Sequence, residues 1–135
     1  MTIHGKYMAI LQCRKTVHTD EGKQRQAALL AFSAFPELKH VILVDEDVDI
    51  FDSNDVLWAM NTRFQGDRDI ITIPGVRCHP LDPSSCPEYT GSIRDVGCST
   101  KTIFDCTVPF ELKEKFKRAA FKEVAVKHWL PDFEL

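Results

Sequence analysis

The residue types best suited to chemistry are concentrated in one block, KHVILVDEDVDIFDSNDVLWAMNTRFQGDRD, which runs from Lys39 to Asp69. Its branched apolar run is typical of a buried parallel strand. The run ends at a group of carboxylates: Asp45, Glu46, Asp47 and Asp49. Ligands of open α/β sheets usually bind at that edge. Paired aspartates there could hold magnesium for phosphoryl transfer, with Asp45 as the nucleophile, or they could cap backbone N–H groups and face solvent.

A second candidate is Lys23, which lies in DEGKQRQ at the start of an expected helix. The amides and dipole of a helix N-terminus favour an anion. Lys23, alone or with Arg25, could therefore complete a phosphate site. The alternative is a solvated surface lysine.

A third candidate is His79 in VRCHPLDP, between a strand end and a proline-rich loop. It could face a ligand as an acid/base group or as a hydrogen-bond donor, or it could simply be exposed. Arg63 and Arg68 could bind a carboxylate or phosphate, although pairing with Asp67 or Asp69 is the alternative. Lys101 is equally ambiguous. No serine or cysteine has the sequence setting of an activated nucleophile such as G-x-S-x-G.

The elements that must position these residues alternate along the chain. We expect strands over Tyr7–Arg14, His40–Val44, Asp69–Ile73 and Thr102–Cys106, and helices over Asp20–Phe35, from Asp52 or Ser53 to Gly66, and over Pro109–Val124. Such alternation predicts an α/β fold: a single domain with a mostly parallel β-sheet, flanking helices and a long Pro/Gly-rich loop over Pro74–Gly97.

Caps and apolar spacing refine the helices. Thr19 or Asp20 is expected to cap the first helix. The expected buried faces are Ala27, Leu30, Ala31, Ala34 and Phe35 in the first helix, Val56, Met60 and Phe64 in the second, and Leu112, Phe116, Ala119 and Ala120 in the third.

Composition sets broad limits on the class of protein. The chain has 135 residues, a 44% hydrophobic and 27% charged composition and a formal net charge of −3. One domain fits this length, and nothing in the charge attracts nucleic acid or an anionic membrane. Without a long apolar run or a secretory signal, we expect a soluble, cytoplasmic protein. The five cysteines form no C-x-x-C pair, so reduced, buried thiols are expected.

Four segments together resemble the C-terminal domain of the UbiD family of reversible decarboxylases, which use prenylated flavin mononucleotide (prenylated FMN). They are EGKQRQAALLAF, the acidic block through DVLWAMNTR, VRCHPLDP and GCSTKTIFDCT. The resemblance runs from about Tyr7 to Phe133. It implies that Lys23 reaches the flavin phosphate and that His79 and Leu81 line the substrate pocket over the flavin ring.

The resemblance also suggests a substrate. Relatives that act on unsaturated acids have an aromatic residue where this chain has His79. A histidine implies an aromatic, hydroxyaromatic or heteroaromatic carboxylic acid with an atom to hydrogen-bond. For these roles, Gly22–Lys23 and His79–Leu81 must converge at one mouth of the sheet.

The chain also departs from the family pattern. In the family, the catalytic Arg…Glu…Glu set, most of the flavin site, a divalent metal and potassium belong to an N-terminal portion, for which this chain has no room. We therefore expect a C-terminal domain or small subunit, inactive alone, that joins that portion in an oligomer. It would supply no catalytic residue and no metal ligand, and the acidic cluster would be structural.

Two alternatives remain: a non-catalytic assembly or interaction module, and a magnesium-dependent phosphoryl-transfer domain built on Asp45 and Asp47. The tail KHWLPDFEL is expected to dock on another subunit or on its own domain.

Overall fold

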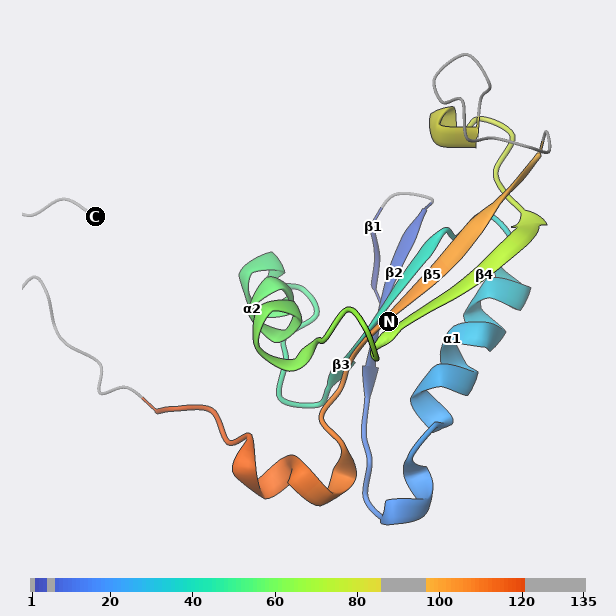
Figure 1. The fold of residues 1–135 in the computed structure, drawn as a ribbon. Coiled ribbons are helices and arrows are strands. Elements are labelled where there is room, and N and C mark those ends of the chain that lie inside the picture. The colour runs from blue at the N-terminus through green and yellow to red at the C-terminus, as the bar shows by residue number, and fades with distance from the viewer. Residues whose placement is uncertain (1, 5–6, 86–96, 121–135) are drawn as a thin grey trace, which may run out of the picture.

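The computed structural model describes residues 2–4, 7–85 and 97–120. They form a five-stranded sheet of order β1-β2-β3-β5-β4 with one α-helix against each face (Figure 1). The strands are β1 (Thr2–His4), β2 (Met8–Cys13), β3 (His40–Asp45), β4 (Ile70–Arg77) and β5 (Cys98–Cys106). The helices are α1 (Lys23–Ala34) and α2 (Ser53–Arg63), with short 3₁₀ helices η1 (His18–Asp20), η2 (Pro83–Ser85) and η3 (Phe110–Lys115).

The predicted mostly parallel α/β sheet is confirmed at its centre, where β2, β3 and β5 run parallel. The edges differ, because β1 and β4 pair antiparallel with their neighbours. We expected β4 to continue the parallel series. Instead it begins beside the end of β5, with Ile70 opposite Phe104, because α2 does not return the chain to the other end of the sheet.

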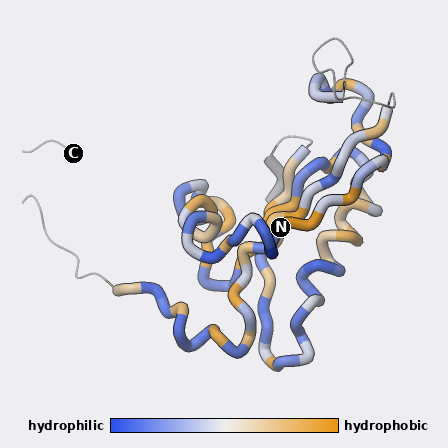
Figure 2. The backbone as a smooth tube through the Cα atoms, viewed as in Figure 1, coloured by the Kyte–Doolittle hydropathy of each residue, from blue (hydrophilic) through white to orange (hydrophobic). Residues whose placement is uncertain are grey.

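Two apolar layers cover the sheet, as the orange strands between the helices show in Figure 2. One layer packs α1 on the sheet and the other packs α2. The predicted face of α1 was wrong in part: Leu30 is 70% exposed, whereas Ala28 and Phe32 are buried with Ala31. The buried face is displaced because Gln24, four residues before Ala28, also turns inward.

The predicted face of α2 is closer to the structure. Val56 is buried, and Met60 and Phe64 pack against the same layer. Asp52 caps the helix, as expected, by accepting from the Asn54 N–H at 2.9 Å.

The last two strands are longer than predicted. β4 continues through Pro74, which we expected to end it, because a register irregularity between Ile73 and Val76 accommodates Pro74 and Gly75. β5 begins at Cys98 and lies between β3 and β4.

The predicted helix over Pro109–Val124 was wrong within the described residues. Only η3 forms there, and residues 116–120 are not helical. Leu112 and Phe116, expected on a buried face, are 37% and 40% exposed. Residues 121–124 and the tail KHWLPDFEL lie outside the described residues, as does the loop over residues 86–96.

In the described part of the chain, no helix has the length and apolar character needed to span a bilayer.

Candidate functional site

Lys23 lies at the first position of α1, where the chain enters the helix from the carboxyl end of β2. Gly22 occupies the N-cap position with φ +88°, and no side chain caps the helix. We expected Thr19 or Asp20 to cap it. The structure shows instead that Asp20 organises the preceding turn and that a glycine makes the left-handed entry.

Asp20 is the centre of that turn. Its Oδ2 accepts from the Thr16 N–H and hydroxyl and from the Val17 N–H, and its Oδ1 accepts from Lys23 Nζ at 2.6 Å. The hydrogen bond from Lys23, with those from Thr16 and Val17, lowers the pKa of Asp20 far below its usual value. The Lys23 side chain stays 67% exposed, so its ammonium faces both this carboxylate and solvent.

His79 lies just past the end of β4, with only 8% of its surface exposed. Its Nδ1 accepts from the Leu81 N–H at 3.0 Å, and its Nε2 lies 3.5 Å from Glu37 Oε1. The Tyr7 ring packs edge-on at 5.7 Å, and the Tyr7 hydroxyl donates to the Leu81 carbonyl at 3.2 Å. Leu81 itself is 78% exposed, so a fixed turn presents an apolar side chain at the surface.

Lys39 contacts the residues that follow this turn, and Lys101 contacts the neighbouring Pro36–Leu38 segment. Lys39 Nζ lies 3.0 Å from Asp82 Oδ2, and Asp82 Oδ1 accepts from the Ser84 N–H at 3.0 Å. Lys101, which is buried, donates to the carbonyls of Pro36 and Leu38. Sequence reasoning missed Tyr7, Glu37 and Lys39 here, because they are far from His79 in sequence and belong to no motif.

The predicted convergence of Gly22–Lys23 with His79–Leu81 was wrong. Lys23 follows the carboxyl end of β2, which pairs with Asp45 at the end of β3. His79 follows Arg77, which pairs with Cys98 at the beginning of β5. The two segments therefore lie at opposite ends of the sheet, as the positions of η1 and η2 show in Figure 1. A parallel strand rises about 3.3 Å per residue, so the six residues of β3 alone separate the ends by about 17 Å.

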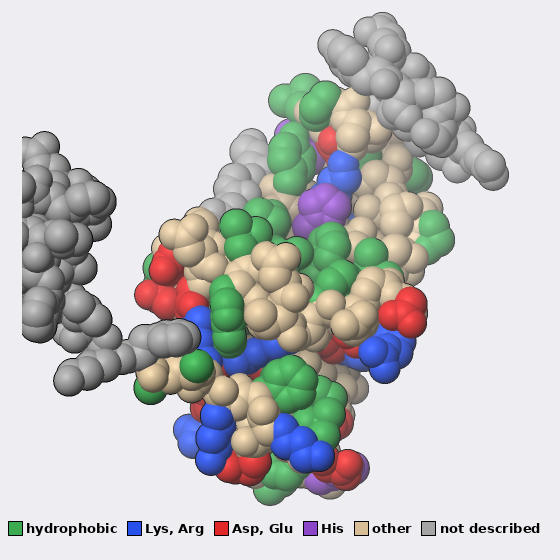
Figure 3. Space-filling model, turned by 60° about the vertical axis from the view of Figure 1, so that its left-hand side comes forward, with side chains coloured by type: hydrophobic (Ala, Val, Ile, Leu, Met, Phe, Trp, Pro, Cys, Tyr) green, Lys and Arg blue, Asp and Glu red, His purple; other side chains and the backbone are tan. Residues whose placement is uncertain are grey.

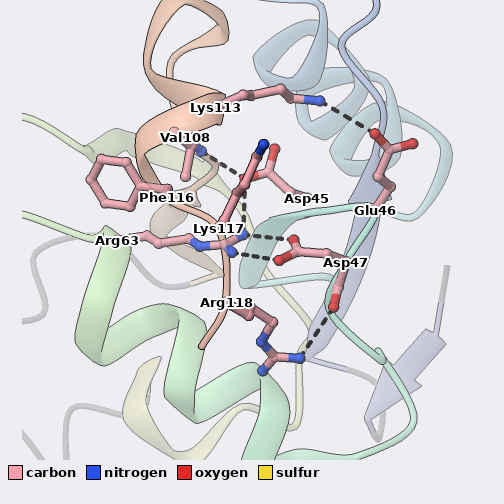
Figure 4. A pocket seen from close by; sticks show the side chains of 9 residues that line it. All are labelled: Asp45, Glu46, Asp47, Arg63, Val108, Lys113, Phe116, Lys117 and Arg118. Atoms are coloured by element: carbon pink, nitrogen blue, oxygen red, sulfur yellow. Dashed lines mark hydrogen bonds and ion pairs between the residues drawn. The ribbon is translucent and has the colours of Figure 1, made fainter. Parts of the chain in front are cut away.

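Arg63 neutralises the acidic end of β3. Its Nη1 donates to Asp45 Oδ2 at 3.0 Å and to Asp47 Oδ1 at 2.8 Å, as Figure 4 shows. Asp45 Oδ2 also accepts from the Val108 N–H at 2.7 Å. The guanidinium thus occupies the position between the carboxylates that a magnesium ion would need. This geometry agrees with a structural role for the cluster and argues against the phosphoryl-transfer alternative.

The carboxylates differ in their electrostatics. Burial raises the pKa of Asp45, against the opposing effects of the Val108 N–H and Arg63. The hydrogen bonds from Arg63 lower the pKa of Asp47. Arg68 Nε lies 3.8 Å from Asp67 Oδ1 on the surface, so the predicted pairing with Asp67 or Asp69 holds for Arg68. It was wrong for Arg63, which pairs with Asp45 and Asp47 instead.

Two cavities of about 300 Å³ flank Arg63 and Phe116. One lies over the acidic strand end and has Lys113, Lys117 and Arg118 on its rim. The other lies between α1, α2 and the end of β5. Neither is lined by Lys23, His79 or Leu81. In the lower half of the face drawn in Figure 3, basic side chains lie next to acidic ones.

Within residues 2–4, 7–85 and 97–120, no group of three or more His, Cys, Asp or Glu side chains is arranged to hold a metal ion. Four of the cysteines are free thiols: Cys78 and Cys106 are buried, as expected, whereas Cys13 and Cys98 are only partly buried. Burial raises the pKa of Cys106 to about 12. Cys86 lies outside the described residues.

Comparison with known proteins gives a consistent result. The family model of the 3-octaprenyl-4-hydroxybenzoate carboxy-lyase C-terminal domain matches residues 2–106. Gallate decarboxylase of Lactiplantibacillus plantarum is 62% identical over 90% of this chain. That match spans 25% of the relative's own length.

Solved structures agree. The apo 3,4-dihydroxybenzoic acid decarboxylase of Enterobacter cloacae is 59% identical, with a TM-score of 0.81 over 95% of this chain and 26% of its own. The UbiD-class enzyme HmfF of Pelotomaculum thermopropionicum, in complex with FMN, is 34% identical, with a TM-score of 0.71 over 85% of this chain and 23% of its own. The chain therefore spans about a quarter of the length of the relatives that it matches.

Proposed function

The chain belongs to the family of the 3-octaprenyl-4-hydroxybenzoate carboxy-lyase C-terminal domain, and from this premise we propose that it acts as the C-terminal domain or small subunit of a UbiD-like reversible decarboxylase. The substrate would be an aromatic, hydroxyaromatic or heteroaromatic carboxylic acid. The observation that carries the proposal is the 62% identity to gallate decarboxylase over 90% of the chain. The 59% identity to a 3,4-dihydroxybenzoic acid decarboxylase points to the same class of acid.

In this proposal His79 and Leu81 form one wall of the substrate pocket. Leu81 is 78% exposed on a turn fixed by Tyr7, which suits an apolar surface that the rest of the enzyme would cover. Such a surface excludes water from a bound aromatic ring. His79 would contribute a hydrogen bond to the acid.

Lys23 is the proposed contact for the phosphate of prenylated FMN. Lys23 is placed where an anion could bind: its side chain is 67% exposed and stands at a helix start without a side-chain cap. The ion pair with Asp20 would compete with the phosphate. Because Lys23 and His79 lie at opposite ends of the sheet, one flavin cannot touch both in one copy of the described chain. The two roles are therefore separate proposals with separate tests.

When bound, prenylated flavin would supply the electron sink for loss of CO₂. The family's N-terminal portion would hold most of it, with a divalent metal and potassium, and would supply the proton-transfer groups. This chain would contact the flavin phosphate and form one wall of the substrate pocket, as part of an oligomer with that portion.

The decisive experiment combines this chain with the N-terminal portion of the related 3,4-dihydroxybenzoic acid decarboxylase and prenylated FMN. We expect CO₂ release from gallate or 3,4-dihydroxybenzoate with the combination and none with the chain alone. Turnover by the chain alone would contradict the subunit role. Stable assembly without turnover or flavin absorbance would instead indicate the non-catalytic assembly module.

Point variants of the combined enzyme separate the roles. Lys23→Met should weaken flavin retention, whereas Lys117→Met should not. Lys117 is a matched control because it is 71% exposed and paired three residues away with Glu114, as Lys23 is with Asp20. His79→Phe should lower activity on phenolic acids while flavin stays bound. Equal flavin retention by the two lysine variants would remove Lys23 from the site.

A further inference from the structure

The two ring nitrogens of His79 have different partners. Nδ1 accepts a hydrogen bond from the Leu81 N–H at 3.0 Å. A nitrogen that accepts in this way carries no proton, so the neutral imidazole is protonated on Nε2. Any ligand atom that His79 contacts must therefore meet the Nε2–H, and it must be an acceptor.

Glu37 is the side chain that faces this proton. Its Oε1 lies 3.5 Å from Nε2, longer than the usual N–H···O separation of about 2.7–3.2 Å. The contact is close enough for the Glu37 acceptor oxygen to orient the ring, yet it leaves the Nε2–H able to donate to another oxygen. Polar contacts in functional sites are often long before a ligand binds.

A buried lysine fixes the backbone on both sides of Glu37. Lys101 Nζ donates to the carbonyl of Pro36 at 2.7 Å and to the carbonyl of Leu38. Lys101 is 5% exposed, and burial lowers its pKa. In the part of the chain that the structure describes, no carboxylate pairs with it. Burying an amine without an ion-pair partner costs free energy. The hydrogen bonds from Lys101 to the Pro36 and Leu38 carbonyls offset part of that cost, and they fix the backbone around Glu37.

Tyr7 closes the remaining side of the ring. It packs edge-on against His79, and its hydroxyl donates to the Leu81 carbonyl. The imidazole is thus held by an aromatic ring, a backbone N–H and a carboxylate, from three separate segments of the chain. This arrangement fixes the direction of one N–H bond.

We propose that Glu37 is a positioning residue for His79, and that it holds the imidazole so that Nε2–H donates to an oxygen on the ring of the aromatic acid. This inference rests on the function proposed above and narrows its substrate class. The preferred acids carry a ring hydroxyl or phenolate oxygen at the position facing His79. An analogue without that oxygen gains nothing from His79.

The kinetic test uses the combined enzyme and a series of hydroxybenzoates in which one hydroxyl is removed at a time. Glu37→Ala should raise KM, or Ki for an analogue that is not turned over, about tenfold for acids with the accepted hydroxyl, which corresponds to one lost hydrogen bond. The same variant should change binding less than about twofold for the analogue without it. Glu37→Gln, which keeps an acceptor oxygen, should recover most of the loss.

The matched control is Glu111→Gln. Glu111 also pairs with a histidine, lying 3.2 Å from His18, but both side chains are about 70% exposed at the other end of the sheet. The Glu111→Gln variant should leave KM and Ki unchanged for every analogue. Equal loss for all analogues in Glu37→Ala would indicate a structural role only, and no loss at all would also overturn the proposal.

A second measurement needs neither cofactor nor turnover. Long-range ¹H–¹⁵N correlation of the imidazole in the 135-residue chain reports which nitrogen is protonated. We expect the Nε2–H form in the wild type, and an Nδ1–H form would overturn the inference. If instead the combined enzyme decarboxylates no acid while the Nε2–H form is observed, the proposed function fails and the geometry of His79 stands.

Discussion

Arg63 binds Asp47 through both terminal nitrogens of its guanidinium: Nη1 donates to Oδ1 at 2.8 Å and Nη2 donates to Oδ2 at 2.6 Å. The Arg63 side chain is only 3% exposed, and its guanidinium carbon Cζ also lies 4.9 Å from the centre of the Trp58 ring. The last residue of α2 is thus tied to the loop that follows β3. Asp45 and Asp47 of the acidic block are therefore both paired with Arg63, and a metal ion would have to compete with that arginine for them.

Replacing Arg63 by methionine should destabilise the fold by about 3 kcal/mol at neutral pH, because the change leaves the buried Asp45 carboxylate without its cation. Urea unfolding followed by circular dichroism measures the difference. Arg68→Met is the control, since Arg68 is 72% exposed, and it should fall within about 0.5 kcal/mol of the wild type. Equal stability of the two variants would show that the network contributes nothing.

Magnesium at millimolar concentration should not raise the melting temperature of the chain. Arg63 already bridges Asp45 and Asp47, and a bound cation would have to displace it. Thermal unfolding with and without MgCl₂ measures this. A rise in Tm that Asp45→Asn abolishes would restore the phosphoryl-transfer alternative.

Acid should weaken the fold through carboxylates such as Asp20 and Asp47, whose pKa values are lowered by hydrogen bonds from Lys23 and Arg63 respectively. A lowered native pKa gives stability that is present above the unfolded value, about 3.9, and is lost as the pH falls through the native value. Asp45, whose pKa is raised by burial, acts in the opposite direction.

Urea unfolding between about pH 2 and pH 7 should therefore show a fall in stability that begins near pH 4. Asp47→Asn should lower stability at neutral pH and reduce that fall. Asp67→Asn is the control because its side chain is 78% exposed. A fall of the same size in Asp47→Asn as in the wild type would remove Asp47 as a cause.

Gly22→Ala should destabilise the chain by about 1 kcal/mol or more, because φ is +88° there and a side chain strains that conformation. No atom lies within 4 Å of the added Cβ, so the cost comes from the backbone alone. In the control Gly66→Ala, the added Cβ meets only the Phe64 ring at 3.8 Å, and the change should be small. Thermal unfolding compares them, and equal Tm values would contradict the left-handed entry to α1.

Cys106 should resist alkylation in the native chain at pH 8, since its thiol is buried and its pKa is raised to about 12. The thiolate is the reactive form, and little of it exists at that pH. Peptide mass spectrometry after iodoacetamide treatment, with and without urea, measures the protection. Rapid native labelling of Cys106 would mean that the end of β5 opens easily.

Sequence patterns predicted the central sheet well because each pattern is local. The apolar run of β3, the Asp52 cap and the Val56–Met60–Phe64 stripe each depend on neighbours within a few residues. The helix expected over Pro109–Val124 failed for the same reason. Its apolar spacing was adequate, but η3 is held by distant groups, such as Glu21, which accepts from the Phe110 N–H, and Lys15, whose carbonyl accepts from Lys113 Nζ.

The candidate site also has features that local sequence patterns predict and features that depend on distant contacts. The sequence by itself determined the family, the parallel centre of the sheet, and the residue types at Lys23, His79 and Leu81. Only the tertiary structure decided their relative positions. Because β4 runs antiparallel to β5, His79 lies at the end of the sheet where the parallel strands begin, while Lys23 lies where they end. Strand direction depends on pairing between residues about 30 apart in the chain, such as Ile70 with Phe104, and no local pattern encodes it. Pairing of β5 with β4 and β3 also brings Lys101 to the carbonyl of Leu38, next to Glu37, in a contact across 63 residues.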